Sequence, residues 1–446
     1  MPISPARAAA FDILLRVEQQ DAYASELLHA EHYAKLSPAD HALATELTMG
    51  VLRWRSLLDR DIAAASSQSV RKLDTEVLAA LRLATYQMQH LDRIPARAAI
   101  HESVELVKRA RKRSAAPFVN AILRKLSQVP RPSNGHLAAL HAASSPEAVA
   151  ETSAQPLWMV ERWFREFGVE TTKLICAHDQ SVPTTTIRLG SGGSEEELRS
   201  NKIELAPGIL LASARIVRSG DVTRTRAFRE GHIAIQDEAS QLVARLVGKG
   251  SHILDCCAAP GGKTASIADR NPTSTIIAVE LHPHRARLLR RLVRAGNVRV
   301  LAADAVRLPL VSQFDRVLVD VPCSGTGTLA RNPEIKWRLK HEDLADLQSR
   351  QLSILQSAMS HVASRGRVLY STCSLEREEN SDVVEKALAS DKSFRLLDCR
   401  HELEILQKEG ELVWKDIDSL ISGPFVRTIP GLHPCDGFFV AILEKI

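Results

Sequence analysis

Residues 254–264 read LDCCAAPGGKT, and this stretch decides the fold of the second half of the chain. Its apolar start is typical of a buried strand, its glycines predict a tight turn, and Lys263 and Thr264 begin a helical pattern. Such a turn lets a ligand approach the backbone N–H groups at the N-terminus of the helix. A Walker phosphate loop needs a glycine five residues before Gly262, where Cys257 stands, so an NTPase is disfavoured. A purely structural turn remains compatible with this motif alone.

Strand-like and helical stretches alternate after Gln236. The expected strands are 252–256, 275–279, 298–302, 316–319, 367–370 and 394–397, and the expected helices are 264–270, 284–295, 342–363 and 377–390. This alternation predicts a parallel sheet covered by helices on both faces. Ligands of such sheets bind beyond the carboxyl ends of the strands, so motifs that follow the strands are expected to share one edge.

Two acidic residues end the second and third of these strands. Glu280 follows IIAV and Asp304 follows LAA. An acid at the first position can hold ribose hydroxyls, and one at the second can receive an adenine amino group. Together with the glycine turn they describe a pocket for an adenosine without a pyrophosphate, which suits S-adenosylmethionine.

The next two strands are each followed by a cysteine. Cys323 lies in DVPCSGTG and Cys373 in YSTCS. A lone cysteine on a strand is usually a small buried hydrophobe, but two at equivalent strand ends indicate chemistry. A zinc deaminase would need a second cysteine at position 326, which is Thr. The seven cysteines are an odd number, which argues against a disulfide framework, and they contain no C-x-x-C pair, so no metal site is expected.

The chain before Gln236 has a different organisation. Residues 1–130 show apolar positions three and four apart, such as Leu43, Leu47 and Val51, and predict an all-helical domain. Residues 131–156 read as a linker that contains some helix. Residues 157–235 predict a small α+β subdomain that contacts RNA, with an amphipathic helix at 158–167, strand-like pieces at 184–189, 209–211 and 232–235, and an acidic helix at 195–199. Residues 236–446 form the α/β domain.

Composition and charge narrow the class of protein. The 446 residues are 45% hydrophobic and 25% charged, which excludes wholesale disorder and collagen-like repetition. No apolar run approaches the ~20 residues that span a bilayer. Asp12 and Arg16 interrupt the apolar start of the chain and argue against a signal peptide, so we expect a cytoplasmic protein.

The net charge of +5 is concentrated in two basic runs. Residues 108–125 include Lys108, Arg109, Arg111, Lys112 and Arg113 without an acid, and residues 285–299 include six arginines. Either run alone can be a solvated helix face. With only 4% aromatic residues, the pair of runs indicates contacts with nucleic-acid phosphates more than stacking on bases.

Together these motifs resemble a known family. Residues 236–446 are similar to the RNA 5-methylcytosine methyltransferases, a branch of the Rossmann-like enzymes that use S-adenosylmethionine. The matching stretches are QDEAS at 236–240, AAPGGKT at 258–264, DVPCSG at 320–325, NPEIKW at 332–337, and YSTCS at 370–374 followed by Glu379 and Asn380. Residues 1–130 resemble the NusB-like RNA-binding domain, which narrows the match to the bacterial RsmB/Sun (Fmu) type.

The resemblance implies the following activity and site. The substrate is 16S ribosomal RNA, and the product carries methyl on cytosine C5. We separately expect the protein to be a monomer. Cys373 attacks the base, Cys323 serves release or proton removal, Asp320 holds the cytosine edge, and Lys263 supports the site and helps to lower a thiol pKa. The residues implied to bind S-adenosylmethionine are Cys257, Ala258, Ala259, Pro260, Gly261, Gly262, Lys263, Glu280, Arg285, Asp304 and Asp320. This chain has Glu280 where the family usually has Asp, and Ala330 in place of a common Arg.

Three alternatives stay open at this point. Spacing alone does not say which thiol attacks, since DNA cytosine methyltransferases use the cysteine of a Pro-Cys turn, here Cys323. The same chemistry can act on transfer RNA. A non-catalytic ribosome-assembly factor could also keep this fold as an RNA-binding platform.

Overall fold

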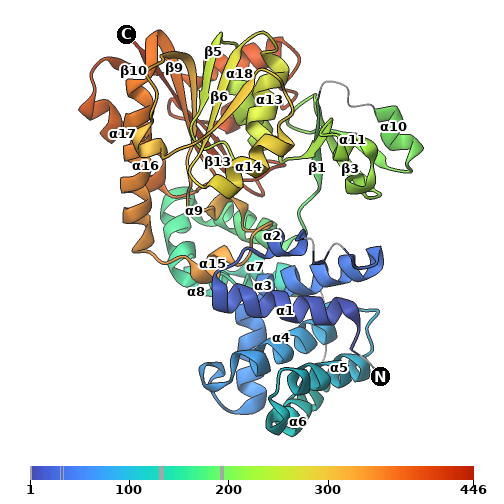
Figure 1. Cartoon of the computed structure of the whole chain (residues 1–446). Helices are drawn as coiled ribbons and strands as arrows, with labels where there is room; N and C mark the ends of the chain where they lie inside the picture. The colour runs from blue at the N-terminus through green and yellow to red at the C-terminus, as the bar shows by residue number, and fades with distance from the viewer. Residues whose placement is uncertain (1–2, 31, 34, 130–134, 191–194) are drawn as a thin grey trace. The chain divides into compact units, whose positions relative to one another are not determined.

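The computed structural model describes residues 3–30, 32–33, 35–129, 135–190 and 195–446 (Figure 1). They form two compact units. The first, here the helical unit, contains the described residues up to Val182 together with Leu329–Leu339. The second, the catalytic unit, contains the described residues of Pro183–Thr328 and Lys340–Ile446. Within the described ranges, no helix combines the length and apolar character that a bilayer span requires.

The helical unit contains the following α-helices: α1 (Pro5–Gln20), α2 (Ala24–Leu28), α3 (Pro38–Ser66), α4 (Thr75–His90), α5 (Ala96–Arg109), α6 (Ala116–Leu126), α7 (Gly135–Ala142), α8 (Pro146–Thr152) and α9 (Leu157–Gln180). Apolar residues at helical spacing, among them Leu47, Leu81 and Leu123, are fully buried in one core. The Ser37 side chain accepts a hydrogen bond from the backbone N–H of Asp40 at 3.1 Å and caps α3. The prediction of a helical N-terminal domain is confirmed.

The boundaries of the units differ from the predicted ones. The expected linker contains α7 and α8, and its residues 131–134 lie outside the described part of the chain. The helix expected to begin an α+β subdomain at residue 157 is α9, which packs on α3 and α8 and belongs to the helical unit. The buried side chains of Trp163 and Ile175 explain this, because they place its apolar face among other helices.

The catalytic unit begins with a small antiparallel sheet. Its strands are β1 (Thr186–Leu189), β2 (Glu204–Pro207), β3 (Ala214–Ser219) and β4 (Ile233–Ile235), in the order β2-β3-β1-β4, with helices α10 (Glu195–Ser200) and α11 (Arg226–Arg229). The piece expected as a strand at 209–211 is instead a loop. Its backbone N–H groups donate to the buried carboxylate of Glu238, at 3.1, 2.8 and 2.7 Å. Residues 191–194, within the predicted subdomain, lie outside the described chain.

The large sheet contains five parallel strands and a point at which the strand order reverses. Its parallel strands are β5 (His252–Asp255), β6 (Thr275–Glu280), β7 (Val298–Ala302), β8 (Phe314–Asp320) and β9 (Val362–Thr372), in the order β7-β6-β5-β8-β9. The chain runs outward from β5 to β7 and then returns to β8, on the other side of β5. Ligands of open α/β sheets bind at such a switch point, beyond the carboxyl ends of the strands.

Helices cover both faces of this sheet, as the pattern predicts (Figure 1). Helices α12 (Glu238–Leu246), α13 (Gly262–Arg270), α14 (Pro283–Leu292) and α18 (Cys399–Lys408) lie on one face, and α16 (Asp343–Ser360) and α17 (Ser381–Ser390) lie on the other. Neighbouring residues of β5 divide between the two cores: Ile253 packs with the first group and Leu254 with the second.

The sheet is not wholly parallel, in contrast to the prediction. β13 (Phe438–Lys445) pairs antiparallel with β9 on one side and with β12 (Phe425–Thr428) and β10 (Phe394–Leu397) on the other; β11 (Ile421–Ser422) follows β12. The predicted strand at 394–397 therefore exists but is antiparallel to its neighbour. β13 is apolar and buried along most of its length, which is why it occupies an interior position in the sheet.

The segment Leu329–Leu339, which follows the Cys323 turn in the chain, lies within the helical unit. It contains the short helix α15 (Ile335–Arg338). The Lys336 ammonium donates to the carbonyl oxygens of Arg53 and Ala154 at 2.9 and 2.8 Å. The Trp337 indole N–H donates to the carbonyl oxygen of Leu52 at 2.6 Å. The NPEIKW stretch is thus part of the helical unit, although the sequence placed it in the methyltransferase domain.

Replacing the buried Lys336 should change how stability depends on pH. Burial lowers the pKa of Lys336 to about 7, from 10.5. Between these values the unfolded chain holds a proton that the folded chain has released. The free-energy cost of burying this lysine is therefore complete below about pH 7 and declines as pH rises. In urea unfolding followed by helical circular dichroism, wild type should gain up to about 1.4 kcal/mol per pH unit above pH 7 relative to Lys336→Met.

The matched control is Lys72→Met, since Lys72 is an exposed lysine of the same unit. This variant should follow the wild-type pH dependence. Parallel curves for wild type and Lys336→Met would contradict the prediction.

Candidate active site

The glycine turn links β5 to α13 at the switch point. The backbone N–H of Cys256 donates to the carbonyl oxygen of Leu318 in β8, and that of Ala258 donates to Val279 in β6, both at 2.9 Å. Gly261 has a φ of 115°, and a Cβ there would lie 2.5 Å from a methyl carbon of Val293. Glycine is therefore required at this position, and the turn is held against both neighbouring strands.

Asp255, at the end of β5, holds the glycine turn in place. It was not among the site residues predicted from the sequence. It is fully buried, and its Oδ2 accepts a hydrogen bond from the Thr264 hydroxyl at 2.7 Å. Burial raises the pKa of Asp255 to about 7, against the opposing effect of Thr264. The acid ending an apolar strand directly before the glycine turn was the available sequence signal.

Two carboxylates follow at the neighbouring strand ends, as predicted. Glu280 is buried at the end of β6, and its Oε1 accepts from the His282 backbone N–H at 3.0 Å and lies 4.0 Å from Nη1 of Arg285. Asp304 is exposed, and its Oδ1 accepts from Val306 N–H at 2.9 Å. Within the described chain, the second oxygen of each carboxylate accepts no hydrogen bond. Those oxygens fit a ligand's ribose hydroxyls and adenine amino group.

The predicted thiols lie side by side. Cys323 follows β8 and Cys373 follows β9, and their sulfur atoms are 2.8 Å apart. The backbone N–H of Cys373 also donates to Sγ of Cys323 at 3.2 Å. The hydrogen bond with Cys373 and burial raise the pKa of the Cys323 thiol well above its usual value.

Asp320 and Lys263 form a charged pair beside the thiols. Nζ of Lys263 donates to Oδ2 of Asp320 at 2.7 Å, and the Ser371 hydroxyl donates to Oδ1 at 2.7 Å. The same ammonium lies 5.0 Å from the centre of the Phe438 ring. Burial acts to lower the pKa of Lys263, but the charge and hydrogen bond of Asp320 outweigh it and raise the pKa. Lys263 is therefore a fixed positive charge at this edge.

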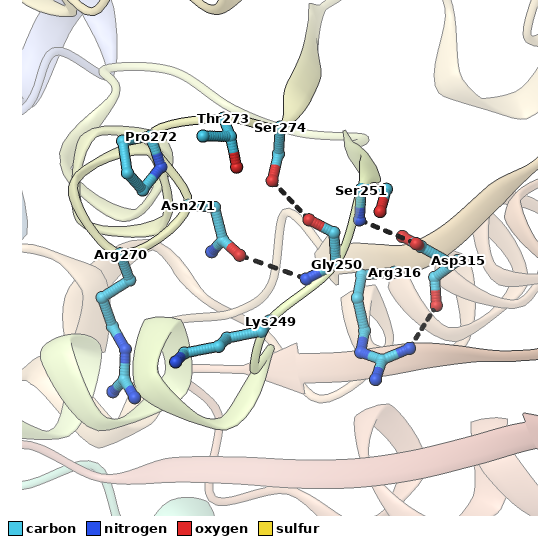
Figure 2. A pocket seen from close by; sticks show the side chains of 10 residues that line it. All are labelled: Lys249, Gly250, Ser251, Arg270, Asn271, Pro272, Thr273, Ser274, Asp315 and Arg316. Carbon is cyan, nitrogen blue, oxygen red and sulfur yellow. Dashed lines mark hydrogen bonds between the residues drawn. The ribbon is translucent and has the colours of Figure 1, made fainter.

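A separate hollow lies elsewhere in the catalytic unit. It has a volume of about 520 Å³ and is lined by residues before β5, before β6 and at the start of β8, as Figure 2 shows. Among its residues, Asp315 accepts from the backbone N–H of Ser251 at 2.7 Å. The hollow thus lies at the amino ends of these strands, opposite the thiols, and is not the reaction site.

The basic run at 108–113 is less free than its sequence indicates. Lys108 pairs with Glu105 at 2.7 Å, Arg109 with Asp12 at 2.7 Å, and Lys112 with Asp74 at 2.9 Å. One acid of the same helix and two acids distant in sequence thus neutralise three of the five predicted RNA contacts. Arg111 and Arg113 form no ion pair with any described residue.

The parallel sheet carries a glycine turn and two acids that suit an adenosine, with two thiols at the same edge. These features define a Rossmann-like methyltransferase. A family model described as 16S rRNA methyltransferase RsmB/F matches residues 246–444, and a NusB family model matches residues 4–128. The chain is 32% identical to the probable ribosomal RNA small subunit methyltransferase B of Bacillus subtilis, over 98% of each chain. It is 34% identical to a putative methyltransferase of Mycobacterium tuberculosis, over 100% of this chain and 97% of the other. The crystal structure of PH0851 has a similar fold, with a TM-score of 0.80, 23% identity and 100% coverage of both chains.

The chain therefore belongs to the RsmB/F family of methyltransferases and carries an N-terminal NusB domain. This confirms the resemblance, the fold class and S-adenosylmethionine as the cofactor. The groups of this chain that fit S-adenosylmethionine are the glycine turn, Glu280 and Asp304.

The buried carboxyl of Asp255 should make stability decrease with pH in the acid range. Its pKa is about 7 in the folded chain and 3.8 when unfolded, so between these values the fold holds a proton that the unfolded chain has lost. This stabilisation is complete near pH 4 and is lost as pH rises through 7. In thermal unfolding at about pH 5 and pH 7.5, Asp255→Asn should lose less stability across the interval than wild type.

Asp346→Asn is the control, because Asp346 is an exposed acid of α16. It should behave as wild type. An Asp255→Asn variant that declines with pH as steeply as wild type would show that Asp255 is already ionised in the fold.

Proposed function

We propose that this protein transfers the methyl group of S-adenosylmethionine to C5 of a cytosine in 16S ribosomal RNA, through a covalent cysteine adduct at C6. The observation that carries the proposal is the pair of thiols, 2.8 Å apart, beside the Lys263–Asp320 ion pair. Membership of the RsmB/F family, and the name of the Bacillus subtilis relative, support the RNA substrate.

Cytosine C5 needs a thiolate because it is not nucleophilic enough on its own. Addition of a thiolate to C6 makes C5 an enamine-like carbon. When bound, S-adenosylmethionine supplies an electrophilic methyl group to that carbon. A base then removes the C5 proton, the C6–S bond breaks and the ring regains its double bond. A target base must be unstacked or already single-stranded to enter such a site.

We assign attack to Cys373, following the RNA family, and release to Cys323. Cys373 is the thiol that interacts electrostatically with the Lys263 ammonium, which supports this assignment. Asp320 holds the cytosine edge, and the positive charge of Lys263 beside it stabilises the negative charge that develops on the ring. Its two hydrogen bonds, from Lys263 and Ser371, fix the orientation of its carboxyl group.

Removing each thiol should give a different result. Cys373→Ala should lose both methylation and any adduct with RNA, because no thiolate adds to C6. Cys323→Ala should still attack but fail to release, so that protein trapped on RNA accumulates. Denaturing gels of protein with labelled RNA and cofactor measure the adduct. Cys399→Ala, which removes a buried thiol of α18, should leave both properties unchanged. A fully active Cys323→Ala without adduct would contradict the release role.

Bisulfite mapping identifies the substrate. Ribosomal 16S RNA and total transfer RNA would be incubated with cofactor and either wild type or Cys373→Ala. One ribosomal cytosine protected only by wild type is the expected result. Protection in transfer RNA would keep the chemistry and overturn the substrate. No protection in either pool, with cofactor bound, would favour the assembly-factor alternative.

The unpaired arginines of the helical unit should bind RNA phosphates. Arg111→Ala with Arg113→Ala should weaken RNA binding and reduce the slope of log affinity against log salt by about 1 to 2. Lys108→Ala with Lys112→Ala removes the same formal charge, but from lysines already paired with acids, and should have the smaller effect. Filter binding over a salt series measures both. Equal slopes for the two double variants would contradict the assignment.

A further inference from the structure

A buried carboxylate links the two cysteine turns. Glu379 has no exposed surface, and it lies in the 3₁₀ turn Arg377–Glu379 between β9 and α17. Its Oε2 accepts from the backbone N–H of Ser324 at 2.8 Å, and its Oε1 accepts from the Ser374 hydroxyl at 2.6 Å. These serines directly follow Cys323 and Cys373. One side chain therefore fixes the residue after each thiol.

Two further hydrogen bonds hold Glu379 itself, and a third ties one of its partners, Gln351, to the Cys323 turn. The Gln351 amide of α16 donates to Oε2 of Glu379 at 2.8 Å and to the carbonyl oxygen of Pro322 at 3.0 Å. The Tyr370 hydroxyl donates to the backbone carbonyl of Glu379 at 2.6 Å. The carboxylate is thus fastened to α16, and its backbone to β9, so it cannot move without disturbing both turns.

No cation neutralises this group. Among the described residues, no lysine, arginine or histidine lies within ion-pair distance of Glu379, and all its partners are neutral donors. Hydrogen bonds from neutral donors stabilise a buried carboxylate, and a charge in a low-dielectric region acts on its neighbours more strongly than a charge in water. Its charge is one of the causes, after Cys373 and burial, that raise the pKa of the Cys323 thiol. The opposite charge, Lys263, interacts with Cys373.

We propose that Glu379 is a positioning residue that holds the two thiols together and makes them unequal. Its charge disfavours a thiolate at Cys323, so that this thiol holds its proton more tightly. A neutral thiol is a poor nucleophile, and attack is thereby confined to Cys373. The consequence for turnover rests on the proposed function, whereas the inequality of the thiols is a property of the protein alone.

Two substitutions of Glu379 distinguish the effect of its charge from the effect of its side-chain length. Glu379→Gln keeps the size of the side chain and removes its charge. Alkylation of Cys323 by iodoacetamide, followed peptide by peptide by mass spectrometry, should then rise several-fold near neutral pH, and its pH profile should move to lower pH, because the nearby negative charge is gone. Glu379→Asp keeps the charge but shortens the reach, and should leave Cys323 protected while kcat falls. Glu385→Gln, an exposed acid of α17, is the matched control and should change neither.

The fully buried thiols report on folding in the same experiment. Cys256 and Cys399 should stay unreactive in every variant if the fold is intact. Unchanged labelling of Cys323 in Glu379→Gln would overturn the proposal, as would a rise shared by Cys256 and Cys399, because that pattern means general loosening. Loss of kcat without change in KM for S-adenosylmethionine is expected, since Glu379 lies outside the cofactor edge. If no RNA is methylated by wild type, the proposed function fails, yet the labelling result still decides this inference.

Discussion

The parallel pairing of β8 with β9 is the constraint on which the reaction edge depends. Asp320 lies opposite Ser371 in this register, and both strands end within two residues of that pair. Each strand is followed by a turn, and the two turns place their thiols next to each other at the edge of the sheet. Because both thiols are close to backbone hydrogen bonds of the sheet, the strand register fixes their separation. A slip of one residue would point one of the two turns to the opposite face of the sheet.

Charged side chains lie near both thiols at this edge of the sheet. The Lys263–Asp320 pair is largely shielded from water, and Ser371 satisfies the other carboxylate oxygen. Burying such a pair costs desolvation free energy, which good geometry and further hydrogen bonds offset. Glu379 lies beyond the other thiol, held only by neutral donors. The charges that act on the two thiols therefore differ: Lys263 interacts with Cys373, and Glu379 is among the groups that act on Cys323.

Sequence patterns were sufficient for the parallel strands and for the groups that follow them. Strand ends in such a sheet share an edge, so Glu280, Asp320, Cys323 and Cys373 could be placed together before any coordinates. What the patterns missed depends on contacts between distant residues. Glu379 is 55 residues from Ser324, Arg109 is 97 residues from Asp12, and β13 reaches the sheet interior by pairing antiparallel with β9. The position of Leu329–Leu339 in the helical unit was missed for the same reason, because no local pattern announces the carbonyl groups of α3 that receive Lys336 and Trp337.

The excursion of Leu329–Leu339 also limits how this architecture can be recombined. The chain passes between its two units at Val182, at Thr328 and again at Leu339, so no single cut separates them. A chimera joined at residue 182 would combine a foreign helical unit with a segment shaped for the carbonyl groups of Leu52, Arg53 and Ala154. Genetic exchange that keeps a working protein must replace the segment and the helices together.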